Sequence, residues 1–407
     1  MLYDIVVVGA GAAGLGAARR LRFAPCRSLV VDARSRPGGR AHTVQMEDLI
    51  LDLGCEWLHS ADSNPLSLLA KDLGFTIDPT PARWGEQAGN RSFPPEDQRA
   101  FHAALQALEE RIEEAARAGR EGPAAAYFEP GSRWTPLIEA FSSYYNGASF
   151  EEVSVLDYAA YHDSGVNWRI SEGLGAMICA LGTGCDVRLG CEVSTIDHTG
   201  ATLRLETNTG TLEARSCVIT VPSPALARDQ LRFRPALPEK RDAAAGLPLG
   251  LADKLFLKVE DPGVVPKDAH VLGKAHDSAT GSYQLQPSGQ PFVECFFGGA
   301  AADALETRNA FVDFALDELS ALYGSAIRQS LRPLAATFWR ADPYAGGSYS
   351  HALPGRRDDR LKLAEPVDQR LFFAGEACSL HSFSTAHGAY ETGVLAAEAA
   401  MAALSRS

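Results

Sequence analysis

The chain opens with apolar runs broken by glycines. Residues 3–8 are mostly apolar and predict a buried strand, and the glycine-rich residues 9–14 predict a tight turn. Residues 11–22 predict a helix, and residues 28–32 predict a second strand. A strand, a glycine turn, a helix and a strand in this order predict a βαβ unit with parallel strands.

The middle of the chain contains one clear helical pattern and then short strand patterns. Within 95–120, apolar residues recur at positions 101, 105, 108, 112 and 116, which predicts an amphipathic helix. Residues 156–181 predict a loop and a helix that ends near Gly182. Short apolar runs then predict strands at 187–189, 193–196, 202–207, 211–214 and 217–221. The last patterns predict strands at 254–259 and 292–297, a helix at 309–323, and a strand, turn and long helix over 371–403.

These elements predict an α/β fold of two interleaved domains. A chain of 407 residues exceeds what one ordinary hydrophobic core accommodates. We expect a Rossmann-like nucleotide-binding domain built from residues 1–75, 185–240 and 335–407. Residues 76–184 and 241–334 would form an α+β substrate domain, with the chain crossing between the two several times.

Composition narrows the class of protein. Hydrophobic residues make up 46% and charged residues 22% of the chain, as in water-soluble globular proteins. The net charge of -13 argues against a nucleic-acid partner, and no apolar run has the length of a membrane span. The apolar stretch 5–18 lacks the basic start of a secretory signal, so we expect a cytoplasmic protein. The eight cysteines show no metal-ligand spacing, which predicts free thiols and no metal centre.

The first turn carries the residues of a dinucleotide site. Gly9 permits the tight bend, Gly11 lets the backbone approach a pyrophosphate, and Gly14 allows close packing of helix on strand. The start of the following helix favours negative charge. Asp32 lies at the distance expected of the acid that binds the adenosine ribose, and it disfavours a 2′-phosphate.

Two further segments favour FAD over a nicotinamide cofactor. Gly38 and Gly39 offer a second close approach of the backbone, and Arg40 offers a charge for the pyrophosphate. Near the other end of the chain, Gly375 and Glu376 form another turn between an apolar strand and a helix of small residues. A nicotinamide enzyme needs only the first turn. The pairing therefore predicts a flavin held between both ends of the chain.

The segments around these turns resemble the flavin-containing amine oxidase family. Residues 32–40 follow the pattern acid-x-Arg-x-x-x-Gly-Gly-Arg, and residues 52–57 follow Asp-x-Gly-x-x-Trp. Residues 172–178, 219–222 and 339–350 are similar to later family motifs and occur in the same order. The resemblance implies an amine oxidase-like fold with bound FAD. It also implies cofactor contacts by further residues, namely Ala13, Arg34, Gly54, Glu56, Trp57, Val193, Trp339 and Ala386.

The same resemblance assigns four residues to the chemistry. Lys254 matches the lysine that holds a water near the flavin N5, and Tyr349 matches the first aromatic wall beside the substrate. The position of the second wall is occupied by Thr385, with Phe383 nearby as a possible substitute. His59 matches a polar residue that faces the substrate in polyamine oxidases.

The resemblance implies oxidation of an amine C–N bond by hydride transfer to flavin N5. The imine would hydrolyse to a carbonyl, and O2 would be reduced to H2O2. Ser348 occupies the position of the cysteine that bonds covalently to FAD in monoamine oxidases, so we expect non-covalent FAD. Two alternatives remain open at this point: an FAD-dependent C–C desaturase or isomerase of the same fold, and a flavin-binding protein without turnover.

Overall fold

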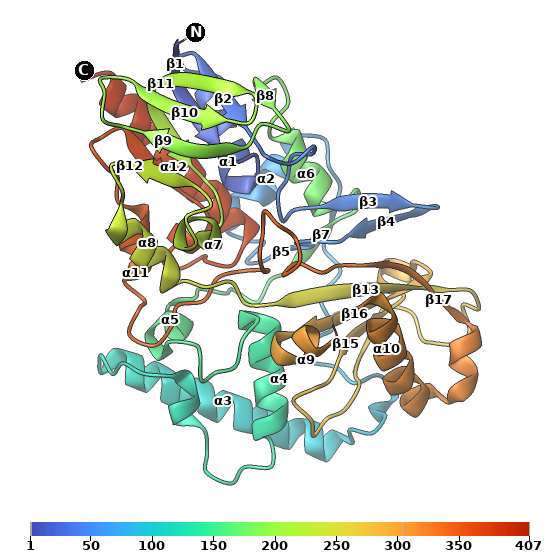
Figure 1. Ribbon diagram of the computed structural model, residues 1–407. Coiled ribbons are helices and arrows are strands. Elements are labelled where there is room, and N and C mark those ends of the chain that lie inside the picture. The colour runs from blue at the N-terminus through green and yellow to red at the C-terminus, as the bar shows by residue number, and fades with distance from the viewer. Residues whose placement is uncertain (1, 306, 407) are drawn as a thin grey trace.

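The computed structural model describes residues 2–305 and 307–406 and divides into two halves (Figure 1). An eight-stranded mixed sheet with strand order β12-β9-β10-β11-β1-β2-β8 lies in the upper half, and β18 pairs with β11. Its parallel centre joins β1, β2, β11 and β18, which come from both ends and the middle of the chain. The strands are β1 (Leu2–Val8), β2 (Ser28–Val31), β8 (Val187–Arg188), β9 (Val193–Asp197), β10 (Leu203–Thr207), β11 (Gly210–Ile219), β12 (Arg232–Arg234) and β18 (Leu371–Phe373).

Both faces of this sheet are covered. Successive side chains of a strand point to opposite faces, so Ile5 and Val7 enter one core whereas Val6 and Val8 enter another. The first core contains α1 (Ala12–Leu21), α2 (Pro65–Asp72), α6 (Leu174–Ala180) and α12 (Ala386–Leu404). The second core receives side chains around α7 (Ser223–Ala227), α8 (Pro238–Ala245) and α11 (Asp359–Ala364).

Small residues let α1 and α12, from opposite ends of the chain, lie side by side (Figure 1). A Cβ atom on Gly16 would lie 2.8 Å from the Tyr390 ring, and one on Gly393 would lie 2.0 Å from the Ala13 carbonyl oxygen. Neither position has room for a side chain. The close contact fixes the C-terminal helix next to the first glycine turn.

The lower half is built on a five-stranded antiparallel sheet with order β14-β15-β16-β13-β17. These strands are β13 (Ala252–Val259), β14 (Ala269–Leu272), β15 (Ser282–Leu285), β16 (Phe292–Gly298) and β17 (Leu331–Ala336). Helices α9 (Gly299–Ala304) and α10 (Arg308–Tyr323) pack with it, and α3 (Pro95–Arg117), α4 (Thr135–Asn146) and α5 (Val155–Ala160) form a helical layer beside it (Figure 1).

Two small sheets connect the halves. One is the hairpin of β3 (Thr43–Met46) and β4 (Leu49–Asp52), which packs on β13 and β17. The other has order β5-β7-β6, from β5 (Trp57–Leu58), β6 (Ile77–Asp78) and β7 (Trp168–Ile170). The fold is therefore α/β with a chain that crosses between the halves several times.

Most predicted elements are confirmed within a few residues, and two were wrong. Segments 211–214 and 217–221, predicted as two strands, form one continuous strand, β11. The two polar residues between them fit into it, because Ser216 is buried in register opposite Ile5 and Arg215 forms an ion pair with Asp4. Strand β7 interrupts the predicted loop before α6. Helix α6 packs with the nucleotide-side core although its residues fall in the range expected for the substrate domain. The domain boundaries stay a prediction.

Candidate active site

A cavity of about 1180 Å³ lies between the two halves and extends from the first glycine turn to the five-stranded sheet. Every site residue predicted from the sequence lines it except Gly14. A Cβ atom on Gly14 would lie 1.8 Å from the Gly9 carbonyl oxygen, so this glycine serves the packing of α1 against the turn. The structure therefore brings together residues that are hundreds of positions apart in the sequence.

The first turn presents an open helix start to the cavity. Helix α1 begins after Gly11, and no side chain caps its first turn. The Asp32 carboxylate is fixed at the end of β2, where Oδ2 accepts from the Ala10 N–H at 2.6 Å and Oδ1 from the Arg34 N–H at 2.8 Å. Gly9 has a φ of 107°, which favours glycine, and a Cβ there would lie 2.4 Å from the Thr220 hydroxyl.

The two arginines predicted to contact the cofactor have different partners. Arg34 donates to both carboxylate oxygens of Asp342, at 2.6 and 2.7 Å. Arg40 donates to Glu376 Oε1 at 2.9 Å and to the Ser348 carbonyl oxygen at 2.5 Å. Burial would raise the pKa of Glu376, but Arg40 and other donors hold it below its ordinary value. Glu376 is therefore a buried carboxylate that ties the segment of Gly38, Gly39 and Arg40 to the C-terminal turn.

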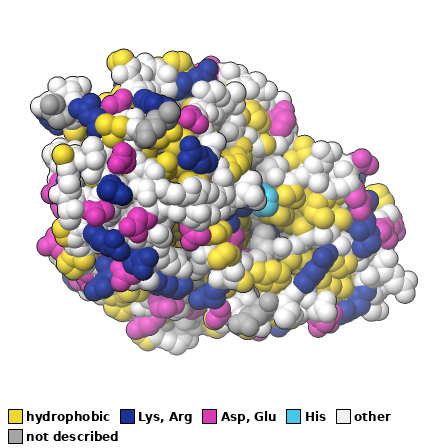
Figure 2. Space-filling model, turned by 45° about the horizontal axis from the view of Figure 1, so that its top comes forward, with side chains coloured by type: hydrophobic (Ala, Val, Ile, Leu, Met, Phe, Trp, Pro, Cys, Tyr) yellow, Lys and Arg dark blue, Asp and Glu magenta, His cyan; other side chains and the backbone are white. Residues whose placement is uncertain are grey.

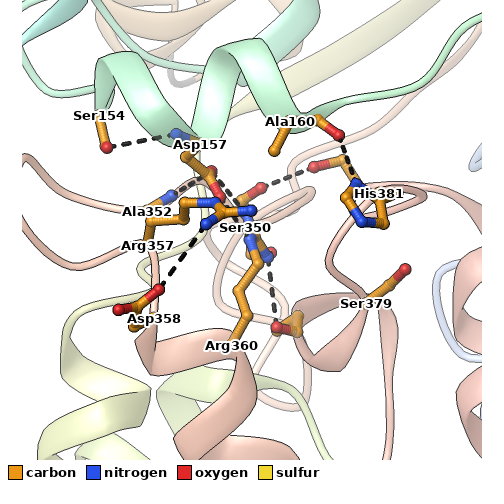
Figure 3. A network of polar contacts seen from close by, with 12 residues as sticks. Ser154, Asp157, Ala160, Ser350, Ala352, Arg357, Asp358, Arg360, Ser379 and His381 are labelled. Atoms are coloured by element: carbon orange, nitrogen blue, oxygen red, sulfur yellow. Dashed lines mark hydrogen bonds and ion pairs between the residues drawn. The ribbon is translucent and has the colours of Figure 1, made fainter. Parts of the chain in front are cut away.

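A buried polar network continues from Glu376, and Figure 3 shows its members Ser350, Arg360 and Asp157. Ser350 Oγ donates to Glu376 Oε2 at 2.6 Å and accepts from Arg360 Nη1 at 3.0 Å. Arg360 pairs in turn with both carboxylate oxygens of Asp157 on α5. His381, at the edge of the same view, donates through Nδ1 to the Ala160 carbonyl oxygen at 2.9 Å (Figure 3).

The substrate end of the cavity contains a compact charge cluster around Lys254. Lys254 Nζ lies 2.8 Å from Glu56 Oε2, 2.9 Å from Glu294 Oε1 and 3.1 Å from the Asp52 carbonyl oxygen. Burial alone would lower the pKa of Lys254, but the two glutamates raise it above its ordinary value, so the ammonium form persists. Arg169 Nε also donates to Glu56, at 2.5 Å, and its guanidinium carbon lies 3.8 Å from the Trp57 ring centre.

His59 is held in one tautomer. Asn167 Nδ2 donates to the Gly165 carbonyl oxygen, so its Oδ1 faces His59 Nδ1 at 2.7 Å and accepts a hydrogen bond from the Nδ1–H. Burial lowers the pKa of His59, which keeps the ring neutral. Its Nε2 atom then carries a lone pair. The Trp57 and Trp84 rings meet edge to face beside it, with centroids 4.7 Å apart.

Aromatic side chains and Thr385 form the remaining walls of the cavity. The Tyr349 hydroxyl donates to the Tyr144 carbonyl oxygen, which fixes the ring. Thr385 caps α12, since its hydroxyl accepts from the Gly388 N–H at 3.0 Å and donates to the Ser382 carbonyl oxygen. Phe383 is 4% exposed, with the Arg360 guanidinium carbon 3.9 Å from its ring centre and the Tyr161 ring packed edge to face at 5.4 Å.

Smaller residues complete the expected cofactor positions. Val193, Gly375 and Ala386 line the cavity, as does Trp339, whose backbone N–H donates to Asp253 Oδ1 at 2.9 Å. A Cβ atom on Gly54 would lie 1.7 Å from the Arg40 carbonyl oxygen, so the glycine lets these two turns meet.

Several cavity residues were missed by sequence reasoning. Glu294 carried a signal, because it is a single acid inside the apolar strand pattern at 292–297. Asn167 lies in a loop and carried none. Glu109 and Glu113 line the cavity from α3, one turn apart, but their helix shows many other charges of the same appearance.

The residues of the nucleotide end fit an FAD. The uncapped start of α1 and Arg40 suit a pyrophosphate, and Asp32 retains acceptor capacity for a ribose. A Cβ on Gly11 would meet its nearest atom, the Gly38 carbonyl oxygen, at 3.9 Å, so this glycine leaves space in the cavity.

No group of three or more metal-ligating side chains occurs within residues 2–305 and 307–406, and no helix in this part is long and apolar enough to cross a membrane. Acidic and basic side chains are interspersed over the face in Figure 2.

Comparisons with known proteins agree with this geometry. Residues 12–401 match the family model of flavin-containing amine oxidoreductases. Polyamine oxidase 4 of Oryza sativa subsp. japonica is 27% identical over 97% of this chain and 88% of that protein. Lysine-specific histone demethylase 1 homolog 2 of Arabidopsis thaliana is 28% identical over 96% of this chain and 57% of that protein.

Solved structures share the fold. Cyclohexylamine oxidase from Brevibacterium oxydans has a TM-score of 0.81 at 23% identity, with 99% of this chain and 100% of that chain covered. Putrescine oxidase with bound putrescine has a TM-score of 0.79 at 18% identity, with 99% of each chain covered. The chain therefore belongs to the family of flavin-containing amine oxidoreductases and is an FAD-dependent enzyme that acts on amines.

Proposed function

We propose that this enzyme oxidises the C–N bond of a primary or secondary amine. Bound FAD would accept a hydride at N5, the imine would hydrolyse to a carbonyl compound and an amine, and O2 would take up the electrons as H2O2. The observation that carries the proposal is the charge of the substrate end. The cavity lining away from the nucleotide end includes five acids, of which Glu56 and Glu294 contact Lys254; the others are Glu109, Glu113 and Asp163. Such a surface favours cationic molecules over neutral sugars or alkenes.

The walls of the cavity suit the alkyl part and the nitrogen of such a substrate. Tyr349 is fixed by its hydroxyl, and Phe383 is buried between Arg360 and Tyr161, so both present rigid aromatic surface. We infer that Phe383 replaces the aromatic wall that Thr385 lacks. The lone pair of His59 Nε2 can accept a hydrogen bond from an amine N–H.

We propose that the cofactor is held without a covalent bond. Ser348 Oγ accepts from the Ala252 N–H at 2.8 Å and donates to the Ala252 carbonyl oxygen at 2.7 Å, and serine cannot form a thioether. The pyrophosphate would lie at the start of α1, with the ribose at Asp32. The nucleotide-binding domain would then comprise residues 1–75, 185–240 and 335–407; its two terminal residues lie outside the described part.

The substrate can be found with a panel of amines. The yellow holoenzyme is mixed anaerobically with monoamines, diamines, polyamines and N-acetylated polyamines, and bleaching of the flavin band is followed. The relatives include polyamine, putrescine and cyclohexylamine oxidases, so the panel spans these classes. We expect at least one amine to bleach the flavin, and H2O2 to appear when air is admitted.

Matched alcohols and saturated ketones are the controls. Bleaching by a ketone with none by any amine would replace amine oxidation by C–C desaturation. Bleaching by amines without H2O2 in air would remove O2 as the acceptor. A flavin that no compound reduces would indicate a binding protein.

A further inference from the structure

The Lys254 ammonium donates hydrogen bonds to Glu56 and to the Asp52 carbonyl oxygen and forms an ion pair with Glu294. Three oxygen atoms lie within 3.1 Å of Nζ, and an ammonium group has three N–H donors and no lone pair. Lys254 is 6% exposed, Glu56 9% and Glu294 3%, so solvent does not compete for these contacts. In the role expected from the sequence, this lysine would hold a water through the N–H that the hydrogen bonds to Glu56 and Asp52 leave.

The two glutamates share one cation. Glu56 Oε2 lies 2.8 Å and Glu294 Oε1 lies 2.9 Å from Lys254 Nζ, and both residues line the cavity. Two carboxylates beside one ammonium repel each other, so the negative charge of Glu56 favours uptake of a proton by Glu294. An ionised Glu294 in the cavity wall can therefore accept a proton.

We propose that Glu294 is the base that receives the proton which an ammonium substrate must lose before its C–N bond is oxidised. The proposal rests on the proposed amine oxidation. In this step a substrate N–H bond breaks, its electron pair stays on nitrogen as a lone pair, and an O–H bond forms on Glu294. No electron is exchanged with the protein, and the total charge of the cavity is unchanged.

The surroundings favour Glu294 over Glu56 as the proton acceptor. Glu56 contacts two cations, Lys254 and Arg169, which hold its pKa well below the ordinary value against the effect of burial. Glu294 contacts the Lys254 cation, and burial together with the charge of Glu56 raises its pKa. A base of raised pKa suits proton transfer near neutral pH.

The other side chains around Glu294 are neutral or already have a hydrogen-bond or ion-pair partner. Gln284 of β15 lies in register opposite Glu294, and Arg169 of β7 donates to Gln284 as well as to Glu56. The pKa of Asp52 is raised by burial to about 6, and its side chain accepts from the start of α6. His59 stays neutral because burial lowers its pKa.

The first test uses the protein without any substrate. Infrared difference spectra of wild type and Glu294→Gln are recorded as a function of pH in light and heavy water. We expect a protonated-carboxyl carbonyl band that titrates above the ordinary carboxyl range in wild type and is absent from Glu294→Gln. Glu318→Gln is the control, because Glu318 is also 3% exposed with a raised pKa but does not line the cavity. A spectrum in which Glu294→Gln changes no titrating band would overturn the assignment.

The second test follows anaerobic reduction of the flavin by a reactive amine across pH. In wild type the rate should fall as pH is lowered, because protonated Glu294 accepts no proton. In Glu294→Gln we expect this acidic limb to vanish and the maximal rate to fall at least about tenfold. Substrate ionisation is common to both proteins and cancels in the comparison.

The two proposals fail in different ways. If amines reduce the flavin and Glu294→Gln retains the wild-type rate and pH profile, the role of Glu294 is wrong and amine oxidation stands. If no amine reduces wild type, amine oxidation is wrong and the role of Glu294 as substrate base falls with it, whatever the infrared titration shows of its proton.

Discussion

Arg360 and Asp157 form a bidentate ion pair that is closed to solvent. Arg360 Nε lies 2.7 Å from Asp157 Oδ1 and Nη2 lies 2.8 Å from Oδ2, and the residues are 0% and 1% exposed. The pair joins α11 to α5 (Figure 3), and Ser350 connects it to Glu376. The substrate-side helix layer and the C-terminal turn are thus held by one buried network.

Removal of either partner of this pair should destabilise the protein strongly. Arg360→Met or Asp157→Leu leaves an uncompensated buried charge, which costs about 3–5 kcal/mol in the free energy of unfolding. The double variant should lose less than the sum of the two single losses, because no lone charge remains. Urea unfolding of wild type, the two single variants and the double variant measures these losses. Additive losses would mean that the two groups do not interact.

Replacement of Lys254 should slow flavin chemistry. Lys254→Met leaves Glu56 and Glu294 facing each other without their shared cation, so we expect flavin reduction or reoxidation to slow by at least about tenfold. Lys258→Met is the matched control, since Lys258 lies on the same strand and pairs with Glu47 outside the cavity. Stopped-flow absorbance gives both rates. Unchanged rates in Lys254→Met would remove its assigned role.

Two glycines of the first turn should respond differently to the same change. Gly14→Ala places a Cβ atom 1.8 Å from the Gly9 carbonyl oxygen, so we expect a large loss of thermal stability with or without FAD. Gly11→Ala places a Cβ where the nearest atom is 3.9 Å away, so the apoprotein should fold normally and bind FAD more weakly. Thermal unfolding of the apoprotein and fluorescence titration with FAD separate the two effects. Equal FAD affinity of Gly11→Ala and wild type would contradict the assigned pyrophosphate position.

Buried neutral histidines should make the protein acid-sensitive. Burial lowers the pKa of His270 from 6.5 to about 4, while Nδ1 donates to the Glu86 carbonyl oxygen and Nε2 accepts from Ser282. As pH falls, the unfolded chain takes up a proton on His270 before the folded protein does. The contribution of neutral His270 to the free energy of unfolding is therefore complete above pH 6.5 and is lost as pH falls from 6.5 to about 4.

This contribution amounts to as much as about 3 kcal/mol. The free energy of unfolding, measured by urea at several pH values, should fall less steeply in His270→Gln than in wild type over this window. The exposed His162 provides the control for replacement of a histidine by glutamine outside the cavity. Identical slopes for His270→Gln and wild type would show that His270 is already protonated in the folded protein.

Local sequence was informative wherever consecutive residues fix local geometry. Gly9, Gly11 and Asp32 predicted the first turn because the bend, the backbone approach and the strand end all lie within one short segment. The helix at 95–117 was evident from its period alone. By contrast, β7 was missed because its three residues gain their pairing only from β5 and β6, more than 90 positions away.

The sequence by itself determined the α/β order of elements, the two glycine turns and, through its motifs, the flavin-dependent family. Each of these depends on residues that are neighbours in the chain. The tertiary structure alone decided which polar groups share the cavity. It placed Glu294 on Lys254, engaged the Thr385 hydroxyl in a helix cap, and buried Phe383 under Arg360. Such contacts join strands and turns that packing brings together, so spacing along the chain does not encode them.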